Sequence, residues 1–382
     1  MPARTRLAGM TAVVAMTAGA LAAPAVAAPA PAGDHHAPTR RAMEAAVKQG
    51  VPGVTGQVKD KQGTWNGTAG VGDIKSGRPR GAHDHYRVGS ITKTFVSTVV
   101  LQLEAEGRLN LNDSVDHWLP GVVRGHGHDG RRITVRQLLN HTSGIYNFTA
   151  DEDFVREFFL KDGFFKHRYD TREPRQLVDI AMKHKPDFPP GTSWNYSNTN
   201  YILAGMIVEK ATGHSYAREV RRRVIKPLRL HDTTVPRTDP RVPQPSGRAY
   251  SKLGEDPAGP SYDVTELNPS SASSAGGMIS DSDDLNRFYS ALLRGRLLPK
   301  KQLAEMTTTV PVEGIPGARY GLGLIERKLS CGTVVWGHGG GIHGSTSEAV
   351  TTKDGRHSLA FNFNGDWTGD SEAVIEAEFC GK

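Results

Sequence analysis

Cysteine is scarce in this chain: Cys331 and Cys380 are the only two among its 382 residues. Neither lies in a C-x-x-C pair or in a zinc-finger spacing, so the pattern excludes a structural zinc site of that kind. In exported proteins an even pair of cysteines indicates a disulfide, and closing a loop of about 50 residues stabilises a fold by about 4 kcal/mol. The alternative is two buried free thiols, since free cysteine is often buried.

Long apolar runs are missing after residue 32, where no stretch approaches the ~20 apolar residues that span a bilayer. At the start, Arg4 and Arg6 precede an alanine-rich apolar run over 7–26, and Ala25-Val26-Ala27 has the small residues of a cleavage region. We interpret residues 1–32 as a signal peptide and processing region rather than as a membrane anchor. We therefore expect a secreted protein with no stable membrane anchor.

Aromatic residues make up 7% of the chain, and they do not interleave with its basic residues. The formal net charge is +7, but lysines and arginines are scattered apart from short clusters such as Arg221-Arg222-Arg223. The aromatic-interleaved basic stripe that marks nucleic-acid binding is missing, so we expect no nucleic-acid partner. An excess of basic over acidic residues suits a protein that works near anionic polymers, such as those of a cell envelope.

Helical and strand patterns follow one another in an order that predicts a mixed fold. The chain begins with a helix capped by Thr39 and a hairpin of strands, and a final helix starts at Ser371. Strands are expected at 54–58, 64–72, 321–324, 333–336, 348–352 and 358–364. Helical segments between long loops are expected at 135–139, 152–160, 176–182, 201–210 and 285–293.

These patterns predict an α/β (α+β) architecture. The early hairpin and the late strands would share one antiparallel β-sheet flanked by the terminal helices, and the middle of the chain would form a mainly helical second lobe. Residues 33–382 then make a single catalytic unit, with an α/β lobe from 39–95 and 305–382 and a helical lobe from 96–304. We expect this unit to be a monomer.

Ser90-Ile91-Thr92-Lys93 opens a strongly apolar helical pattern that ends at Gly107. Residues three apart share a helix face, so the Lys93 amine can approach the Ser90 hydroxyl. Serine needs a nearby base to become nucleophilic at neutral pH, and a helix start supplies N–H groups that favour developing negative charge. A capping serine beside an exposed lysine is the alternative if the motif stands alone.

Two further motifs accompany the first. Tyr196-Ser197-Asn198 lies in a loop that enters a helix; a phenol whose pKa is lowered by neighbouring cations could act as a base, and Asn198 offers a donor and an acceptor to a substrate amide. The glycines of Gly337-His338-Gly339-Gly340-Gly341 follow a strand and mark close approach by a ligand or backbone. His338 adds a ring that titrates near pH 7. Each motif alone is also compatible with ordinary turns.

In this order, the three motifs resemble the serine β-lactamase and penicillin-binding protein superfamily, and within it the class C β-lactamase-like group. The resemblance runs from about residue 42 to the end of the chain. It includes Arg87-Val88-Gly89-Ser90, Leu138-Leu139 with His141-Thr142-Ser143-Gly144, Tyr196 to Asn200, Ser274-Ala275-Gly276, Ser330-Cys331-Gly332 and Phe379-Cys380-Gly381-Lys382.

The resemblance implies a catalytic set without a cofactor or metal. Ser90 would be the acylated nucleophile, and Lys93 with Tyr196 the proton-transfer pair, with the choice of base between them left open. His338 stands where many relatives have lysine and would orient Tyr196 and the leaving group. Cys331–Cys380 would be the disulfide.

The resemblance also implies a set of substrate contacts. Asn198 would hold the acyl-side amide, and Gly339, Gly340 and Gly341 would line the leaving-group side. The backbone N–H groups of Ser90 and Gly341 would form the oxyanion hole.

Two departures from the family pattern concern the leaving-group side. Ile325 stands where related carboxypeptidases have an arginine for the substrate's terminal carboxylate, and Gly339 and Gly341 replace threonines. Arg327, on the same strand face as Ile325, and His343 are candidate substitutes. Acylation chemistry is therefore the firmer part of the interpretation.

The leading interpretation is a D-alanyl-D-alanine carboxypeptidase-like serine hydrolase that acts on cell-wall peptidoglycan peptides and reacts with penicillins. A class C-type β-lactamase, an esterase or a D-amino-acid peptidase are alternatives on the same scaffold, with a small peptide or β-lactam as substrate. A non-catalytic penicillin- or peptidoglycan-binding protein is the alternative of another class. Histidine pairs at 83–85 and 126–128 lack further ligands, so metal catalysis is not expected.

Overall fold

The computed structural model describes residues 35–312 and 317–381. The interpretation of residues 1–32 as a signal peptide therefore concerns a segment outside the described residues. Within the described part, none of the helices is both long and apolar enough to cross a membrane.

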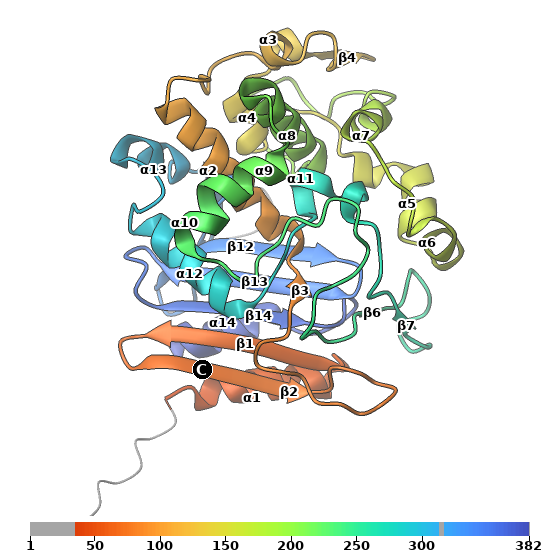
Figure 1. The fold of residues 1–382 in the computed structure, drawn as a ribbon, viewed down its shortest axis with the longest axis vertical. Helices are drawn as coiled ribbons and strands as arrows, with labels where there is room; N and C mark the ends of the chain where they lie inside the picture. The colour runs from red at the N-terminus through yellow and green to blue at the C-terminus, as the bar shows by residue number, and fades with distance from the viewer. Residues whose placement is uncertain (1–34, 313–316, 382) are drawn as a thin grey trace, which may run out of the picture. The chain divides into compact units, whose positions relative to one another are not determined.

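One antiparallel sheet of eight strands organises the fold (Figure 1). The strand order is β2-β1-β14-β13-β12-β11-β10-β9, with bounds β1 Gly53–Asp60, β2 Gly63–Gly70, β9 Val310–Pro311, β10 Ala318–Tyr320, β11 Ile325–Lys328, β12 Val334–Ile342, β13 Ser345–Thr352 and β14 Ser358–Phe363. The N-terminal hairpin joins the C-terminal strands through β1 and β14, where Val54 lies opposite Phe363. The prediction of one sheet built from both ends of the chain is confirmed.

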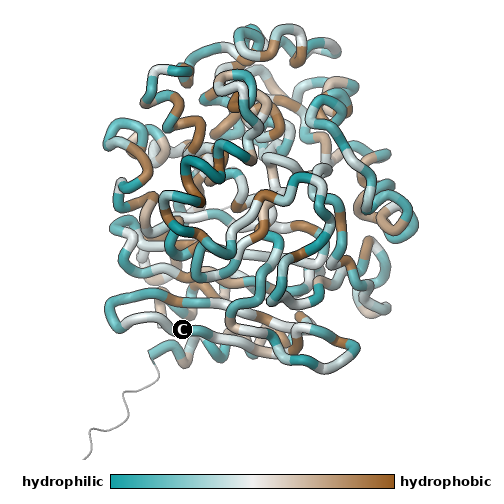
Figure 2. The backbone as a smooth tube through the Cα atoms, viewed as in Figure 1, coloured by the Kyte–Doolittle hydropathy of each residue, from teal (hydrophilic) through white to brown (hydrophobic). Residues whose placement is uncertain are grey.

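Helices cover both faces of this sheet. The terminal helices α1 (Ala37–Lys48) and α14 (Ser371–Cys380) share an apolar core with one face, while α12 (Ser282–Leu293) packs on β1, β13 and β14. Successive strand residues point to opposite faces, so Phe361 joins the core with α1 and α14 and its neighbour Ala360 joins the core of the other face. Hydrophobic residues recur along the helices and strands, and hydrophilic ones dominate the turns between them (Figure 2).

The remaining helices form the second lobe. Their bounds are α2 Thr92–Ala105, α3 Val115–Trp118, α4 Val135–Leu139, α5 Glu152–Phe158, α6 Lys161–His167, α7 Pro174–Ala181, α8 Asn198–Thr212, α9 Tyr216–Val220, α10 Lys226–Leu228, α11 Ser273–Gly276 and α13 Lys300–Met306. Helix α2 is buried along most of its length and packs against α8, α9 and α11. The structure differs from the predicted lobe boundary at α12, which lies within 96–304 but packs on the sheet.

The predicted strand at 321–324 is wrong. These residues form a turn between β10 and β11, in which the Gly321 N–H donates to the Leu324 carbonyl at 2.7 Å. Gly323 has a φ of +71°, which is costly for residues with a side chain. The apolar residues Leu322 and Leu324 reflect burial in the core shared with the helical lobe rather than strand pairing.

The two cysteines form a disulfide, as the sequence predicted. Cys331 lies in the turn between β11 and β12, and Cys380 is the last residue of α14. The bond therefore fastens the C-terminal helix to the turn before β12, the strand that carries the glycine-rich motif.

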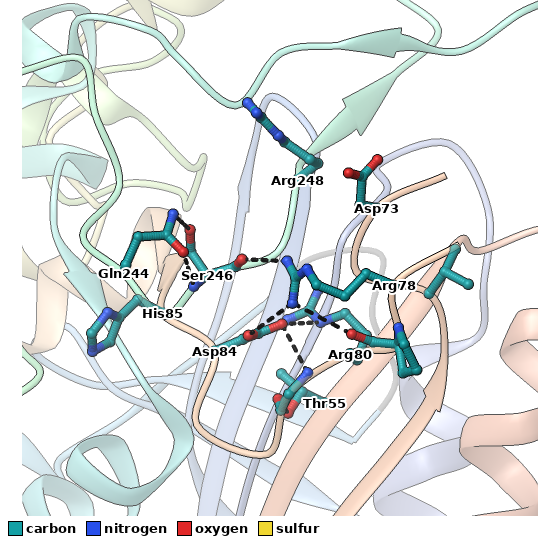
Figure 3. A network of polar contacts seen from close by, with 12 residues as sticks. Thr55, Asp73, Arg78, Arg80, Asp84, His85, Gln244, Ser246 and Arg248 are labelled. Carbon is teal, nitrogen blue, oxygen red and sulfur yellow. Dashed lines mark hydrogen bonds and ion pairs between the residues drawn. The ribbon is translucent and has the colours of Figure 1, made fainter. Parts of the chain in front are cut away.

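A buried ion pair holds the loop that leads from the N-terminal hairpin toward Ser90 (Figure 3). Arg80 and Asp84 lie 3.1 Å apart with both side chains 1% exposed. Asp84 also accepts the Gly81 N–H, and the Thr55 hydroxyl of β1 donates to the Gly81 carbonyl. Arg80 in turn donates to Asn362 of β14 at 3.2 Å. The loop is thereby pinned to two neighbouring strands of the sheet.

Replacing Asp84 by alanine is expected to lower the free energy of unfolding by about 3–5 kcal/mol, because it leaves the Arg80 guanidinium buried without its counter-ion. Asp179→Ala is the matched control: it removes an ion pair with Arg175 in which both side chains are half exposed, and should cost less than about 0.5 kcal/mol. Urea unfolding measures both, with Asp84→Asn as a milder third variant. Equal losses at the two sites would contradict the role given to the buried pair.

Candidate active site

Ser90 lies in a tight turn at the start of a buried helix. The turn η1 (Gly89–Ile91) leads directly into α2, and β12 passes beside it. This approach depends on glycines: a Cβ on Gly340 would lie 2.9 Å from the Ser90 nitrogen, and one on Gly89, at φ +50°, would lie 2.8 Å from the Gly341 nitrogen. The glycine-rich strand therefore brings its backbone against Ser90, as such a cluster predicts.

Lys93 supplies a buried amine to Ser90. Its side chain is fully buried, and its Nζ lies 3.0 Å from the Ser90 Oγ. Nζ also lies 2.8 Å from the Oδ1 of Asn198 and 2.8 Å from the carbonyl oxygen of Ala275. Burial lowers the pKa of Lys93 well below its usual value of 10.5.

The hydrogen bonds of Lys93 determine the direction in which its neutral amine presents the lone pair. A neutral amine has two hydrogens and one lone pair. The oxygens of Asn198 and Ala275 are fixed acceptors that take both hydrogens, so the lone pair is directed at Ser90. The Ser90 O–H can then donate to Nζ, which is the arrangement that a general base requires. The geometry favours Lys93 as the group that accepts the serine proton.

Tyr196 completes the group around the Ser90 hydroxyl. Its phenol hydrogen-bonds to Ser90, and the Lys93 Nζ lies 4.7 Å from the centre of its ring. Burial raises the pKa of Tyr196 above its usual value of 10, which is opposite to the shift expected from neighbouring cations. The structure therefore does not support a phenolate base at this position. A protonated phenol can instead pass a hydrogen to the leaving group.

His338 does not contact Tyr196 in the way that the resemblance implied. Its Nε2 lies 2.8 Å from the hydroxyl of Tyr320, and its Nδ1 lies 2.5 Å from the Gly339 carbonyl oxygen. The ring centres of His338 and Tyr196 are 6.4 Å apart. Tyr320, and not Tyr196 as expected, is thus the tyrosine that hydrogen-bonds to His338. Burial lowers the pKa of His338 to about 3, so its ring is neutral at physiological pH.

A second histidine sets the direction of the hydrogen bonds around Tyr320. The Nδ1 of His141 accepts the Ser197 backbone N–H at 3.2 Å, so its hydrogen lies on Nε2, 3.2 Å from the Tyr320 hydroxyl. Tyr320 therefore accepts from His141 and donates to the Nε2 of His338. The remaining hydrogen of His338 is on Nδ1 and is directed at the Gly339 carbonyl. With both nitrogens engaged, His338 anchors β12 rather than exchanging protons with the substrate.

A pocket of about 120 Å³ opens beside Ser90. Its lining includes Asn198, Gly341 and His343, and its apolar wall is formed by Phe148, Phe154, Phe158 and Phe159. None of its lining residues is Asp, Glu, Lys or Arg. Burial lowers the pKa of His343 to about 4, so this ring is also neutral. The pocket therefore offers apolar contact and neutral hydrogen-bonding groups next to the nucleophile.

Arg327, one of the proposed contacts for a substrate carboxylate, is engaged in ion pairs. Its guanidinium lies 2.7 Å from Glu348 and 3.3 Å from Glu372. Glu348 is opposite Gly339 in the sheet, and a Cβ on Gly339 would lie 2.5 Å from its carboxylate oxygen. The structure does not place Arg327 among the residues of the Ser90 pocket. Its role in substrate binding stays a prediction, and its charge is already neutralised.

Sequence reasoning missed several groups in the site. Tyr320 stood in no motif, and Ala275 was named only within the resemblance, without a role. The phenylalanines between 148 and 159 were not assigned to the site, although Phe154 and Phe158 share a helix face. His141 was likewise named without a function.

One group of carboxylates in the described part of the chain lies close enough together to share a metal ion: Asp232, Asp281 and Asp284. Each already has a protein partner. Asp281 accepts the Asp284 N–H at the start of α12, Asp284 accepts the Thr233 hydroxyl, and Asp232 contacts His85. None of the three lines the Ser90 pocket. We assign the group a structural role at the beginning of α12.

Comparison with known proteins agrees with this geometry. A family model described as Beta-lactamase matches residues 39–377. The chain belongs to the β-lactamase family. It is a serine hydrolase of the β-lactamase fold, related to penicillin-binding proteins.

Solved structures and characterised proteins similar to this β-lactamase-family hydrolase fall into two groups. A D-stereospecific amidohydrolase from Streptomyces sp. is 61% identical, with a TM-score of 0.87 over 91% of this chain and 99% of that one. The D-amino acid amidase from Ochrobactrum anthropi SV3 is 28% identical, with a TM-score of 0.77 over 90% of this chain and 98% of that one. Penicillin-binding protein 4* of Bacillus subtilis (strain 168) is 28% identical over 317 residues. The aligned part covers 80% of this chain and 66% of the length of that protein.

Replacing Lys93 by glutamine is expected to slow acylation of Ser90 in this β-lactamase-family hydrolase by about 10²–10⁴-fold, because it removes the base. Lys93→Arg should be equally slow, because a guanidinium stays protonated and has no lone pair for the serine proton. Stopped-flow acylation by a p-nitrophenyl ester measures both rates, and circular dichroism checks folding. An active Lys93→Arg variant would show that the base lies elsewhere.

The rate of acylation is expected to rise with pH through a single ionisation and then level off. The reactive form is the neutral amine of Lys93, and because burial lowers its pKa, the midpoint should lie well below 10.5. His338, with a pKa of about 3, should add no step between pH 5 and 8. A pH–rate profile of the wild type and of His338→Asn measures this. A step near pH 6.5 that His338→Asn removes would contradict the neutral ring.

Proposed function

We propose that this protein is a D-stereospecific amide hydrolase that forms an acyl-enzyme on Ser90. The observation that carries the proposal is the buried Lys93 amine, 3.0 Å from the Ser90 Oγ and with acceptors for both of its hydrogens. Such an amine makes the hydroxyl nucleophilic toward an acyl carbon. The 61% identity with a protein described as a D-stereospecific amidohydrolase supports the D configuration of the substrate.

In the acylation step, the Ser90 Oγ attacks the substrate carbonyl carbon while its proton moves to Lys93. The carbonyl oxygen becomes negative and is held by the N–H groups of Ser90 and Gly341, a type of contact worth about 3–4 kcal/mol per donor. Tyr196 donates its hydrogen to the leaving amine as the C–N bond breaks, and Lys93 returns a proton to Tyr196. Water then attacks the ester, gives one proton to Lys93, and the acid leaves as Ser90 regains its hydrogen.

The acyl side of the pocket favours a large apolar substrate side chain. The four phenylalanines of its wall, from Phe148 to Phe159, surround the space next to Asn198. Burying a side chain of phenylalanine size stabilises a complex by about 1.5–3 kcal/mol. D-amino acid amides with an aromatic or long aliphatic side chain fit this wall best.

The leaving-group side favours small or uncharged amines over a terminal D-alanine. A free carboxylate there needs a cation, but Ile325 is apolar and Arg327 is paired with two glutamates. Arg327, Glu348 and Glu372 together carry a net negative charge, which would repel the terminal carboxylate of a substrate on this side. A D-alanyl-D-alanine carboxypeptidase, which would use the same nucleophile and base, is therefore the second candidate.

We further propose that the enzyme acts outside the cell, on amides or peptides of D-amino acids such as those of the cell wall. Two features support this location. Residues 1–32 have the pattern of an export signal, and the Cys331–Cys380 disulfide is of a kind that persists in oxidising compartments.

Hydrolysis of three substrates by the purified protein tests the proposal: D-phenylalanine amide, L-phenylalanine amide and a peptide ending in D-Ala-D-Ala. We expect the D-amide to react at least about 100-fold faster than the L-amide, a difference of about 2.7 kcal/mol in activation free energy. It should also react faster than D-alanine is released from the peptide. Ser90→Ala is the control and should abolish all three activities.

Two outcomes would contradict the proposal and assign a different function to the protein. Faster release of D-alanine from the peptide would assign the protein as a carboxypeptidase. A stable penicillin adduct on Ser90 without turnover of any of the three substrates would assign it as a binding protein.

A further inference from the structure

A second hollow of about 690 Å³ lies in the stretch from residue 215 to residue 237, which includes α9 and α10. It shares no lining residue with the Ser90 pocket, and none of its lining residues is Asp or Glu. We call it the basic groove after its positively charged side chains, which are Arg218, Arg221, Lys226, Arg229 and Arg237.

The five cations of the basic groove form no ion pair with any residue that the structure describes. The acidic residues in this stretch and just after it are engaged with other bases: Glu219 with Arg222 and Arg223, Asp232 with His85, and Asp239 with Arg241. Like charges that share a groove repel one another, and nearby carboxylates do not relieve this repulsion. An anion that entered the groove would therefore be held by several cations at once.

The backbone around the groove is unusual as well. Helix α9 continues as a π-helical turn, η4 (Arg221–Ile225), before α10 begins, and such turns often occur at functional sites. Arg229 and Arg237 have φ values of +54° and +57°, in the left-handed region that residues with side chains rarely adopt. Conformations of this kind cost about 1–3 kcal/mol each and cluster at ligand sites. Here Arg229 ends α10 in this conformation, and neither arginine forms an ion pair with a residue that the structure describes.

We propose that the basic groove binds a linear phosphate polyanion. Four of its five cations are arginines, whose planar forks match the oxygens of phosphate groups. Arg218, Arg221 and Lys226 are exposed and line the same groove, and several separate cations suit a chain of anions better than one ion. The lining contains no Phe, Tyr or Trp on which nucleic-acid bases could stack, which favours a polymer without bases.

Binding in the groove leaves the Ser90 pocket free, because the two sites have no lining residue in common. The hydrolase can thus be held on a phosphate-bearing polymer while it turns over small substrates. This inference does not depend on which amide or peptide the enzyme cleaves.

Fluorescence polarisation with labelled linear inorganic polyphosphate tests the groove at low ionic strength. The triple variant Arg218→Gln/Arg221→Gln/Lys226→Gln should raise the Kd at least about tenfold and reduce the salt slope by about 3. The control Lys61→Gln/Lys185→Gln/Arg296→Gln removes the same charge from exposed positions outside the groove and should change the Kd less than about twofold. Both variants should keep their rate of Ser90 acylation, which shows that they are folded.

Three results would overturn the inference. One is an equal loss of affinity in the two triple variants, which would mean that net charge alone attracts the polymer. Another is the absence of saturable polyphosphate binding to the wild type. The third is tighter binding to a single-stranded DNA oligonucleotide or to vesicles of anionic phospholipid than to polyphosphate.

Discussion

The burial of the Lys93 amine is the constraint on which the active site depends. A charged ammonium is expensive to remove from water, and none of the carboxylates in the described part of the chain is bonded to this one to compensate. The neutral form is the one that the site stabilises, because Asn198 and Ala275 accept its two hydrogens. The same two contacts orient its lone pair toward Ser90, so burial produces both the basicity and the direction that nucleophilic catalysis needs.

This arrangement explains why distant segments of the chain must meet. Ser90 and Lys93 come from the start of α2, Asn198 from the first turn of α8, and Ala275 from α11. Strand β12 closes the site with glycine backbone, because a side chain at position 340 would collide with the turn around Ser90 and one at position 89 would collide with β12. His338 contributes to the same construction. Its neutral ring, fixed between Tyr320 and the Gly339 carbonyl, holds the strand in place and adds no charge near the leaving group.

Much of the fold was predictable because local periodicity and turn chemistry agree with the final packing. Helix α1, the first hairpin, α2 and α14 all follow from such patterns. The predicted cap at Thr39 is wrong, because α1 begins at Ala37 and the Thr39 hydroxyl donates to Glu378 of α14. The turn at Gly321–Leu324 was missed because its leucines are buried by tertiary contacts, and burial alone does not distinguish a strand from a turn.

The sequence motifs identified Ser90, Lys93 and Tyr196 as site residues, but they did not predict how burial shifts the pKa values of Lys93 and Tyr196. The partner of His338 could not be predicted, because Tyr320 reaches it through the pairing of β10, β11 and β12. The direction of the pKa shift of Tyr196 depends on burial that only the folded chain shows. The cluster Arg221-Arg222-Arg223 likewise divides in the structure: Arg222 and Arg223 bind Glu219, while Arg221 lines the basic groove.

The protonation state of Lys93 is the most direct test of this account. A ¹⁵N NMR titration of lysine-labelled protein can follow its Nζ, with Lys93→Gln used to assign the signal. The account predicts a neutral amine at pH 7, with a pKa well below that of the exposed lysines. An ammonium signal that persists until about pH 10, the ordinary range for lysine, would contradict it.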